Sequence, residues 1–294
     1  MTVENFLSYL RNERNYSALT VQSYGEDLAQ FEDFFRHLDN LLSWETIDSD
    51  IVRAWMESMM DKGHTATTVN RRLSALRSFY RFSLANGMVD HNPAHGIQGP
   101  KKRKPLPQFL KEKEMDEILC PDMWNNNIFE HVRARTILLL FYSTGIRLAE
   151  LISLDDDMVD FERREIRVTG KRRKQRVIPF GQELHDAIRD YMMRRDKEVA
   201  CDNGALFVTK HGKRMNHNQV RYEVSKNLSR VSTLKKRTPH VLRHTFATAM
   251  LNHDAEIESV KKLLGHESLS TTEIYTHTTF EQLRKVYKNA HPRA

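Results

Sequence analysis

The chain has 294 residues, enough for two domains that each bury a core of their own. It has no apolar run near the ~20 residues of a membrane helix, and its start lacks the basic and apolar stretches of a signal peptide. Mean hydropathy is −0.62, and the two cysteines, Cys120 and Cys201, have no metal-ligand spacing. These features exclude a membrane-inserted or disulfide-built protein and favour a cytoplasmic one with reduced thiols.

Charge is distributed unevenly along the chain. The net charge is +7 and the isoelectric point is about 9.3, yet residues 1–96 carry 9 Lys and Arg against 13 Asp and Glu. The remaining residues therefore hold a net +11. Such an excess is typical of proteins with a polyanionic partner, although many basic proteins bind no nucleic acid.

Residues 1–96 are predicted to form a bundle of four helices. The longest apolar stripe follows Ser17, a plausible N-cap, and recurs every three or four residues at Val21, Tyr24, Leu28, Phe31, Phe35 and Leu38. A second stripe runs from Val69 to Leu84 and is closed by Gly87. Two shorter helices are indicated around Ile51–Met59 and Phe6–Leu10.

The helix predicted at about 66–85 has a second face without acidic residues. This face consists of Asn70, Arg71, Ser74, Arg77, Ser78 and Arg81. A polar helix face is usually just solvated, but a basic, acid-free face within an acidic domain favours contact with DNA phosphates.

Residues 97–108 are predicted to be a linker between the two domains. Three prolines disfavour regular structure there, and four consecutive cations need water or phosphates around them: Lys101, Lys102, Arg103 and Lys104. The segment is either a solubilising spacer or a connection between two lobes that close around a duplex.

Residues 109–294 are predicted to form a mixed α+β domain, so that the whole chain is mainly α with a small β-hairpin or sheet. Helices are expected at 112–119 and 132–142. Ile166 and Val168 on one side of a basic turn, and Val177 and Pro179 on the other, suggest a β-hairpin. Four further helical segments are expected at 181–199, 216–231, 239–252 and 256–264.

Three motifs in this half supply reactive side chains. Thr238 and Pro239 signal a helix start, so His240 and Arg243 share a helix face, while Leu242, Phe246, Ala249 and Met250 lie on a face that would be buried. Arg147 precedes another helix start, and Tyr275 follows His266 by nine residues. A phenol nucleophile, two guanidiniums and several imidazoles can attack a phosphodiester without a metal.

Each of these residues also has an ordinary structural interpretation. His240 and Arg243 could form surface ion pairs, and Arg147 could pair with Glu150. Tyr275 could be a core tyrosine, and His266 could hydrogen-bond a helix C-terminus. The combination in this order and spacing is much harder to obtain by chance than any single member.

At these positions the chain resembles the tyrosine recombinase (λ-integrase-like) family, specifically the Xer subfamily and, by its last residues, the XerC branch. The resemblance covers nearly the whole chain. Its motifs are Thr144-Gly-Ile-Arg147-Leu-Ala-Glu-Leu151, Thr169-Gly-Lys171, His240-Val-Leu-Arg243-His244, Leu264-Gly-His266, Ser270-Thr-Thr-Glu-Ile-Tyr275-Thr-His277 and Ala290-His-Pro-Arg-Ala294.

The resemblance implies a core-binding domain at 1–96, a catalytic domain at 109–294 and a role for each motif residue. Tyr275 would form a 3′-phosphotyrosyl bond, and Arg147 with Arg243 would hold the non-bridging oxygens. His240 and His266 would assist by hydrogen bonding and proton transfer, and Lys171 would protonate the leaving 5′ oxygen.

The turn that carries Lys171 departs from the family pattern. The family often has Gly-Lys-Gly-x-Lys there, whereas Lys171 is followed by Arg172, and the lost glycine removes an easy positive-φ residue. Lys174 therefore remains a rival general acid.

The function implied is resolution of chromosome dimers at dif-like sites in double-stranded DNA, in the cytoplasm and at the nucleoid. A second Xer-type recombinase in a heterotetrameric synapse and an FtsK-like DNA translocase are the partners implied, with no cofactor. Two alternatives are the integrase of a mobile element, for which an extra N-terminal domain has no room here, and a DNA-binding accessory protein without catalysis. A metal nuclease is disfavoured because no compact carboxylate cluster is present.

The last predicted helix has an apolar face at Phe280, Leu283 and Tyr287. We expect this helix to be donated to a neighbouring subunit, which would couple the position of Tyr275 to assembly. The alternative is a helix that packs on its own domain.

Overall fold

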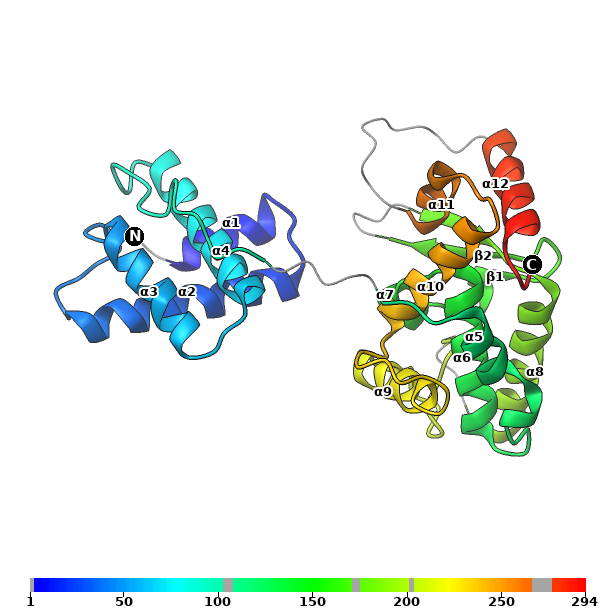
Figure 1. Cartoon of the computed structure of the whole chain (residues 1–294). Helices are drawn as coiled ribbons and strands as arrows, with labels where there is room; N and C mark the ends of the chain where they lie inside the picture. The colour runs from blue at the N-terminus through cyan, green and yellow to red at the C-terminus, as the bar shows by residue number, and fades with distance from the viewer. Residues whose placement is uncertain (1–2, 103–107, 171–174, 201–203, 266–276) are drawn as a thin grey trace. The chain divides into compact units, whose positions relative to one another are not determined.

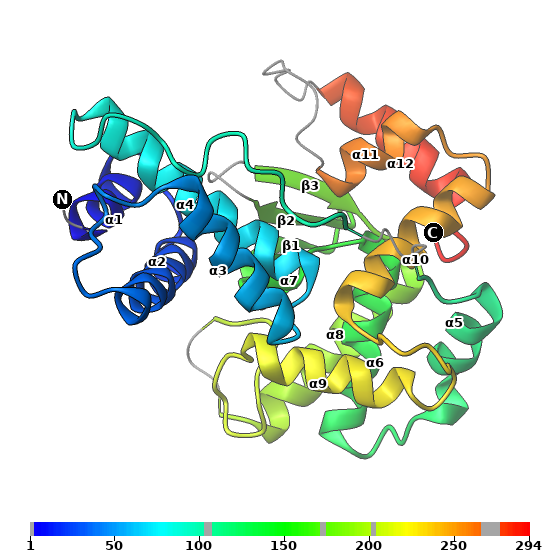
Figure 2. The same ribbon diagram turned by 60° about the vertical axis from the view of Figure 1, so that its left-hand side comes forward.

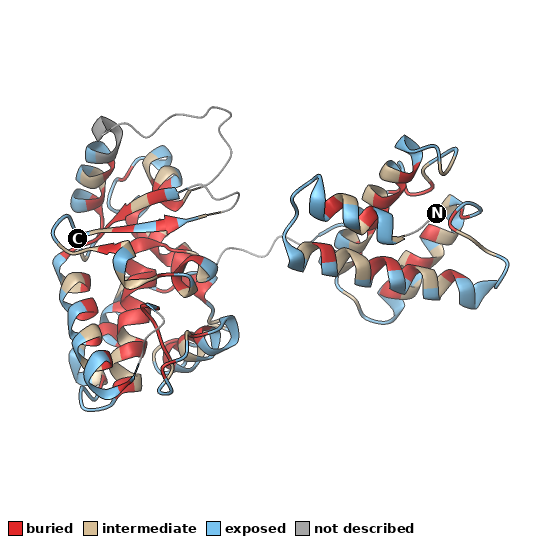
Figure 3. Cartoon of the chain, turned by 180° about the vertical axis from the view of Figure 1, so that it is seen from behind, coloured by how far each residue is buried: buried red, intermediate tan, exposed pale blue. Residues whose placement is uncertain are grey.

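The computed structural model describes residues 3–102, 108–170, 175–200, 204–265 and 277–294, without the side chains of 277–280. The chain divides into two compact units, Met1–Pro105 and Leu106–Ala294, which are described separately below (Figure 1). Each unit has its own buried core (Figure 3). Within the described ranges, none of the helices combines the length and the apolar character that a membrane span needs.

The first unit is helical, as predicted. Its helices are α1 (Val3–Asn12), α2 (Ala18–Leu38), α3 (Ser49–Asp61) and α4 (Ala66–Ala85). Ser17 caps α2 by accepting the Thr20 N–H at 3.2 Å, and Val21, Leu28, Phe31 and Phe35 of the predicted stripe are buried. The stripe is the core face as far as Phe35, whereas Leu38, the last residue of α2, is exposed. Trp44, between α2 and α3, completes this core and its carbonyl accepts the Tyr80 hydroxyl at 3.0 Å.

The second unit combines helices with a small antiparallel sheet, so the predicted fold class is confirmed. Its order is α5 (Glu112–Leu119), a 3-10 turn (Pro121–Met123), α6 (Phe129–Thr144), α7 (Leu148–Ile152), a 3-10 turn (Asp156–Met158), β1 (Val159–Asp160), β2 (Glu165–Thr169), β3 (Gln175–Pro179), α8 (Gln182–Glu198), α9 (His217–Leu228), α10 (Pro239–Asn252), α11 (Ile257–Leu264) and α12 (His277–Ala290). The strands lie in the order β1-β2-β3 (Figure 2), with Ile166 opposite Ile178.

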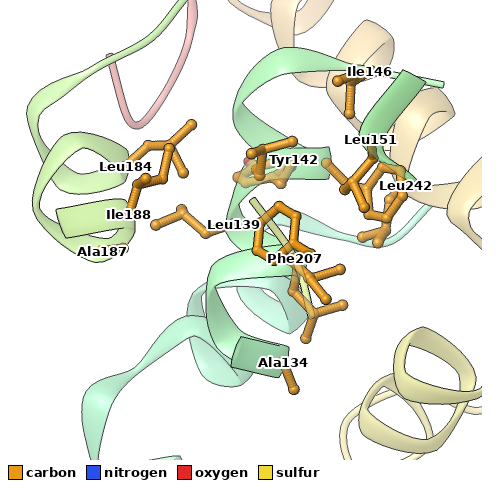
Figure 4. Close-up of a cluster of buried hydrophobic side chains, with 14 of the residues drawn as sticks. Ala134, Leu139, Tyr142, Ile146, Leu151, Leu184, Ala187, Ile188, Phe207 and Leu242 are labelled. Carbon is orange, nitrogen blue, oxygen red and sulfur yellow. The ribbon is translucent and has the colours of Figure 1, made fainter. Parts of the chain in front are cut away.

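Helix α6 is the central element of this unit. Its residues from Thr136 to Thr144 are all buried, which explains why the segment is apolar on every side instead of amphipathic. Figure 4 shows Leu139 and Tyr142 of α6 between Leu184 and Ile188 of α8 on one side and Leu242 of α10 on the other. α6 therefore fixes the position of α10, which starts at Pro239 as predicted and buries Leu242, Phe246, Ala249 and Met250.

Helix α12 packs on its own domain in this single chain. Leu283, Tyr287 and Ala290 are buried together with Phe246 of α10 and Leu263 of α11, and Figures 1 and 2 both show α11 and α12 side by side. The self-docked alternative therefore describes the isolated chain. Donation of α12 to a neighbour in an assembly remains a prediction, and the Phe280 side chain lies outside the described residues.

The chain end after α12 is anchored by His291, which is 4% exposed. Its Nε2–H donates to the Tyr142 carbonyl at 3.0 Å, and its Nδ1 accepts the Arg293 N–H at 3.1 Å. Both ring nitrogens are thus used by the neutral imidazole. Burial lowers the pKa of His291 to about 4, against the opposing effect of the hydrogen bond to Tyr142.

This imidazole should make the stability of the second unit sensitive to acid. An unfolded His291 binds a proton below pH 6.5, whereas the folded one resists until about pH 4. Its contribution is therefore complete above pH 6.5 and is lost as the pH falls from 6.5 to 4, by up to about 3 kcal/mol. We expect urea unfolding followed by circular dichroism to give a lower free energy of unfolding at pH 5 than at pH 7.

The control is His291→Phe. The imidazole stacks on the rings of Phe246 and Tyr287, and phenylalanine keeps a ring in this place but cannot titrate. This variant should be less stable at pH 7 and should lose less stability on acidification. Part of the pH dependence should remain, because burial also lowers the pKa of His244. An equal loss in wild type and variant would show that His291 does not cause it.

Candidate active site

Three arginines meet at the C-terminal end of α11. The carbonyls of Leu263, Leu264 and Gly265 accept from Arg176, Arg243 and Arg147, in that order, at 3.3, 2.6 and 2.6 Å. The last carbonyls of a helix have no partner within it and carry the negative end of its dipole, so cations are favoured there. One helix end thus gathers guanidiniums from β3, from α10 and from the start of α7.

Arg243 is buried, with 8% of its surface exposed, and it joins two helix ends. Its other terminal nitrogen, Nη1, donates to the carbonyl of Gly145 at 2.6 Å. Gly145 ends α6 with φ of 57°, and a β-carbon there would lie 2.5 Å from Phe246 and 2.7 Å from Leu264. A glycine is therefore required at 145 for both its conformation and the space around it.

Arg147 is more open than Arg243, with 39% of its side chain exposed. It stands at the N-cap of α7, where its backbone N–H donates to Oε2 of Glu150 and its Nη1 donates to Oε1, both at 2.8 Å. The expected pairing of Arg147 with Glu150 is present, together with the bond to Gly265. The guanidinium is thus oriented from two sides and still reaches solvent.

Glu150 is shared between two arginines. It is 3% exposed, and Arg176 donates to its two oxygens at 2.6 and 2.9 Å. Burial alone would raise the pKa of this carboxyl, but the hydrogen bonds and charge of Arg176 and the bonds from Arg147 lower it to about 2. Glu150 is therefore a carboxylate at every pH of interest.

The cluster has an excess of positive charge. Arg147, Arg176 and Arg243 face the one carboxylate of Glu150. Burial, together with the charges of Arg147 and Arg176, lowers the pKa of Arg243 to about 10. An anion placed beside Arg147 and Arg243 would relieve this repulsion, so the site is suited to a phosphate group.

His240 and His244 form a pair one turn apart on α10. Their Nε2 atoms are 3.0 Å apart, so one imidazole donates a proton to the lone pair of the other. Burial lowers the pKa of His244, and His240 and Arg243 lower it further. His240 is exposed and lies one turn before Arg243, as the sequence predicts. Among the described residues, no three His, Cys, Asp or Glu side chains gather as metal ligands.

Three predicted catalytic residues lie outside the described residues: Lys171, His266 and Tyr275. Lys174, the rival general acid, lies outside them as well. Gly265 precedes His266, and Arg176 follows Lys174 by two positions.

The candidate DNA-binding face of α4 is partly engaged within the first unit. Arg71 forms an ion pair with Asp27, which is 2% exposed, and Arg77 donates to the carbonyls of Ala94 and Ile97. Asn70 donates to the carbonyl of Pro100 at 2.9 Å. These three side chains hold the bundle and the following segment in place, in addition to any contact with DNA.

The other DNA-binding candidates, on α4 and in the segment from Lys101 to Lys104, have fewer internal contacts where they are described. Ser74 donates to the Asn70 carbonyl at 2.8 Å, Ser78 is half-buried, and Arg81 is exposed, as are Lys101 and Lys102. Arg103 and Lys104 lie outside the described residues. Contact of this whole set with DNA remains a prediction.

Two family models match the chain. Residues 108–282 match the phage integrase family, and residues 3–87 match the phage integrase N-terminal SAM-like domain. The chain belongs to the phage integrase family. The predicted membership of the tyrosine recombinases is thereby confirmed.

The relatives of this recombinase agree with the family. It is 37% identical to tyrosine recombinase XerC of Chlorobaculum tepidum, over 98% of this chain and 94% of that protein. It is 38% identical to tyrosine recombinase XerC of Pelotomaculum thermopropionicum, over 99% of this chain and 98% of that protein. The fold is similar to that of XerH site-specific recombinase bound to palindromic difH substrate in a post-cleavage complex. The TM-score is 0.73, and the match has 21% identity over 97% of this chain and 83% of that chain. The protein is a site-specific DNA recombinase.

Sequence reasoning missed Arg176 in the recombinase. The sequence places Arg176 at the end of the basic turn before Val177, whereas in the structure it lies in β3, is 9% exposed and is bonded to Glu150. A usable signal was present, because Arg176 stands two positions before Ile178 and so shares a side of the strand with this apolar residue. In the structure both Arg176 and Ile178 are buried. A charged residue on the inward side of a strand requires a buried partner of opposite charge.

Proposed function

We propose that this recombinase cuts and rejoins DNA through a 3′-phosphotyrosyl intermediate and resolves chromosome dimers at dif-like sites. The observation that carries the proposal is the arginine cluster on the last carbonyls of α11. The segment with His266 and Tyr275 begins at the next residue. A phosphate held by Arg147 and Arg243 would therefore lie close to the start of that segment.

The proposed reaction conserves the number of phosphodiester bonds. The Tyr275 oxygen attacks phosphorus and forms a phosphotyrosyl bond, while the bond from phosphorus to the 5′ oxygen breaks. The phenol loses a proton, for which His240 and His266 are the candidates, and Lys171 gives a proton to the departing 5′ oxygen. Arg147 and Arg243 stabilise the charge on the non-bridging oxygens. Because the link to tyrosine preserves the bond, religation needs neither ATP nor a metal.

The pair on α10 supports a proton-handling role for His240. In the His240–His244 hydrogen bond, one Nε2 carries the proton and the other accepts it. Burial lowers the pKa of His244, which favours the neutral ring, and a neutral ring can either accept from or donate to His240.

The Xer role is supported by the relatives named XerC, which match over nearly their whole length. XerH, a fold neighbour, was captured on its difH substrate. Double-stranded DNA with a dif-like site is accordingly the proposed substrate, in the cytoplasm and at the nucleoid. A second Xer-type recombinase in a heterotetramer and an FtsK-like translocase are the proposed partners.

The test is a denaturing gel of the recombinase with a nicked duplex that carries a dif-like site. A nick beside the scissile phosphate lets the cleaved end diffuse away, so the covalent complex accumulates. We expect a protein–DNA band of low mobility that forms equally in EDTA. A binder without catalysis would give no band, and a metal-dependent nuclease would give cleavage that EDTA removes.

The identity of the general acid can be decided chemically. Lys171→Ala should cleave slowly, and sulfur at the 5′ bridging position should restore its rate, because a thiolate leaves without a proton. Lys174→Ala should show no such restoration. The reverse pattern in a cleavage assay with both substrates would assign the acid to Lys174, with Arg172 in place of the family's glycine as the cause of the shifted turn.

A further inference from the structure

We infer that Arg176 is a positioning residue of the phosphate site: it balances the charge of Glu150, so that this carboxylate can orient Arg147 without neutralising it. The inference rests on the proposed function, because it concerns the same phosphate. In this role the buried Arg176 affects the reaction without contacting DNA.

The contacts of Arg176 with the described part of the chain are all internal. Its two terminal nitrogens donate to the two oxygens of Glu150, and its Nε donates to the Leu263 carbonyl. A β-carbon at Gly265 would lie 3.1 Å from its Cδ, so the end of α11 closes over the side chain. With 9% of its surface exposed, Arg176 acts through Glu150 and does not itself bind the phosphate.

Glu150 orients Arg147, but its negative charge also offsets the positive charge of Arg147. Its carboxylate fixes Arg147 through the backbone N–H and through Nη1. A carboxylate with Arg147 as its only partner would also cancel the charge that Arg147 presents to a phosphate. Arg176 occupies both carboxylate oxygens, so the group as a whole, with Arg243, keeps a net charge of about +2 and faces the anion with it.

A merely structural interpretation makes a different prediction. If Arg176 only fastened β3 to α11, its loss would disturb the site equally for charged and uncharged substrates. If it supplies charge balance, its loss should matter most when the substrate carries full negative charge.

The experiment compares two scissile groups in the same nicked duplex. One is the ordinary phosphodiester, and the other is a methylphosphonate, in which a methyl group replaces one non-bridging oxygen and removes the charge. Rates of covalent complex formation are measured in single turnover for wild type, Arg176→Gln, Arg176→Lys and the double variant Glu150→Gln/Arg176→Gln. Circular dichroism and thermal unfolding establish that each variant is folded.

We expect Arg176→Gln to cleave the phosphodiester roughly 10- to 100-fold more slowly than wild type, somewhat less than loss of a direct oxyanion donor. On the methylphosphonate the difference should shrink to a few-fold. Arg176→Lys keeps the charge and should fall between wild type and Arg176→Gln. The double variant restores the net charge of the cluster, so it should cleave the phosphodiester faster than Arg176→Gln.

The inference is overturned by equal defects on both substrates, or by a double variant no faster than Arg176→Gln. If Arg176→Gln does not fold, the double variant still tests the idea, because removal of both partners of a buried pair is tolerated far better than removal of one. Its defect on the phosphodiester should then be no larger than on the methylphosphonate, and a larger one rejects charge balance. Absence of covalent complex with the wild type and phosphodiester would reject the proposed function instead.

Discussion

Replacing Tyr275 by Phe should abolish covalent attachment to DNA and leave binding affinity close to that of the wild type. The phenolic oxygen is the atom that bonds to phosphorus in the proposed reaction, so its removal eliminates the chemistry and not merely a contribution to it. Affinity comes mainly from phosphate contacts elsewhere on the protein. The measurements are a denaturing gel for the covalent complex and a gel-shift titration at fixed salt for binding.

A matched control is Tyr222→Phe, which removes the hydroxyl of an exposed tyrosine on α9, 65% exposed. This variant should form covalent complex at the wild-type level. A covalent band that persists with Tyr275→Phe would mean that another side chain is the nucleophile. A large loss of affinity with the same variant would mean that Tyr275 contributes to binding, and the two effects would then have to be separated.

Local signals made much of this fold predictable from sequence. Ser17 and Thr238 stand before the helices that they were expected to start, and the apolar faces of α2 and α10 are the buried ones. Such features depend on residues three or four positions apart, which a periodic pattern records directly. The two-residue strand β1 was not predicted, because so short a segment shows no alternation.

The arrangement within the site was less predictable, because it depends on partners far apart in the chain. Arg243 bonds to a carbonyl 98 positions away, and Arg147 to one 118 positions away. Backbone carbonyls have no sequence signature, so nothing in the motifs indicated that three arginines would meet at one helix end. The internal contacts of Asn70 and Arg77 could not be predicted for the same reason, because their acceptors are backbone carbonyls in loops.

The structure also explains why two glycines accompany the arginines in these motifs. Gly145 and Gly265 both end a helix in the left-handed region, with φ of 57° and 65°. Each directs its own carbonyl at an arginine: Gly145 at Arg243, and Gly265 at Arg147. A left-handed residue turns the chain away so that the helix end stays open to the guanidinium.

Replacing Arg147 or Arg243 by Ala should slow cleavage by roughly 10²–10³-fold or more, the usual result of removing one oxyanion donor. Lys should substitute poorly at either position because it cannot hold two oxygens in a planar fork. Arg163→Ala is a suitable control, since its side chain is 72% exposed and lies 4.0 Å from its acidic partner. Near-wild-type single-turnover rates for both alanine variants would reject the proposed site.

The two variants should differ in stability although they lose similar activity. Arg243→Ala leaves the buried carbonyls of Gly145 and Leu264 without their donor, at a cost of about 1–3 kcal/mol for each unsatisfied group. Arg147→Ala should cost much less, because its side chain is half exposed and Glu150 keeps both bonds to Arg176. Thermal unfolding should therefore show a clear drop in midpoint for Arg243→Ala and a small one for Arg147→Ala. An equal drop would mean that Arg147 supports the fold as much as Arg243 does. The solvent exposure of Arg147 would then be no argument that its role is phosphate binding.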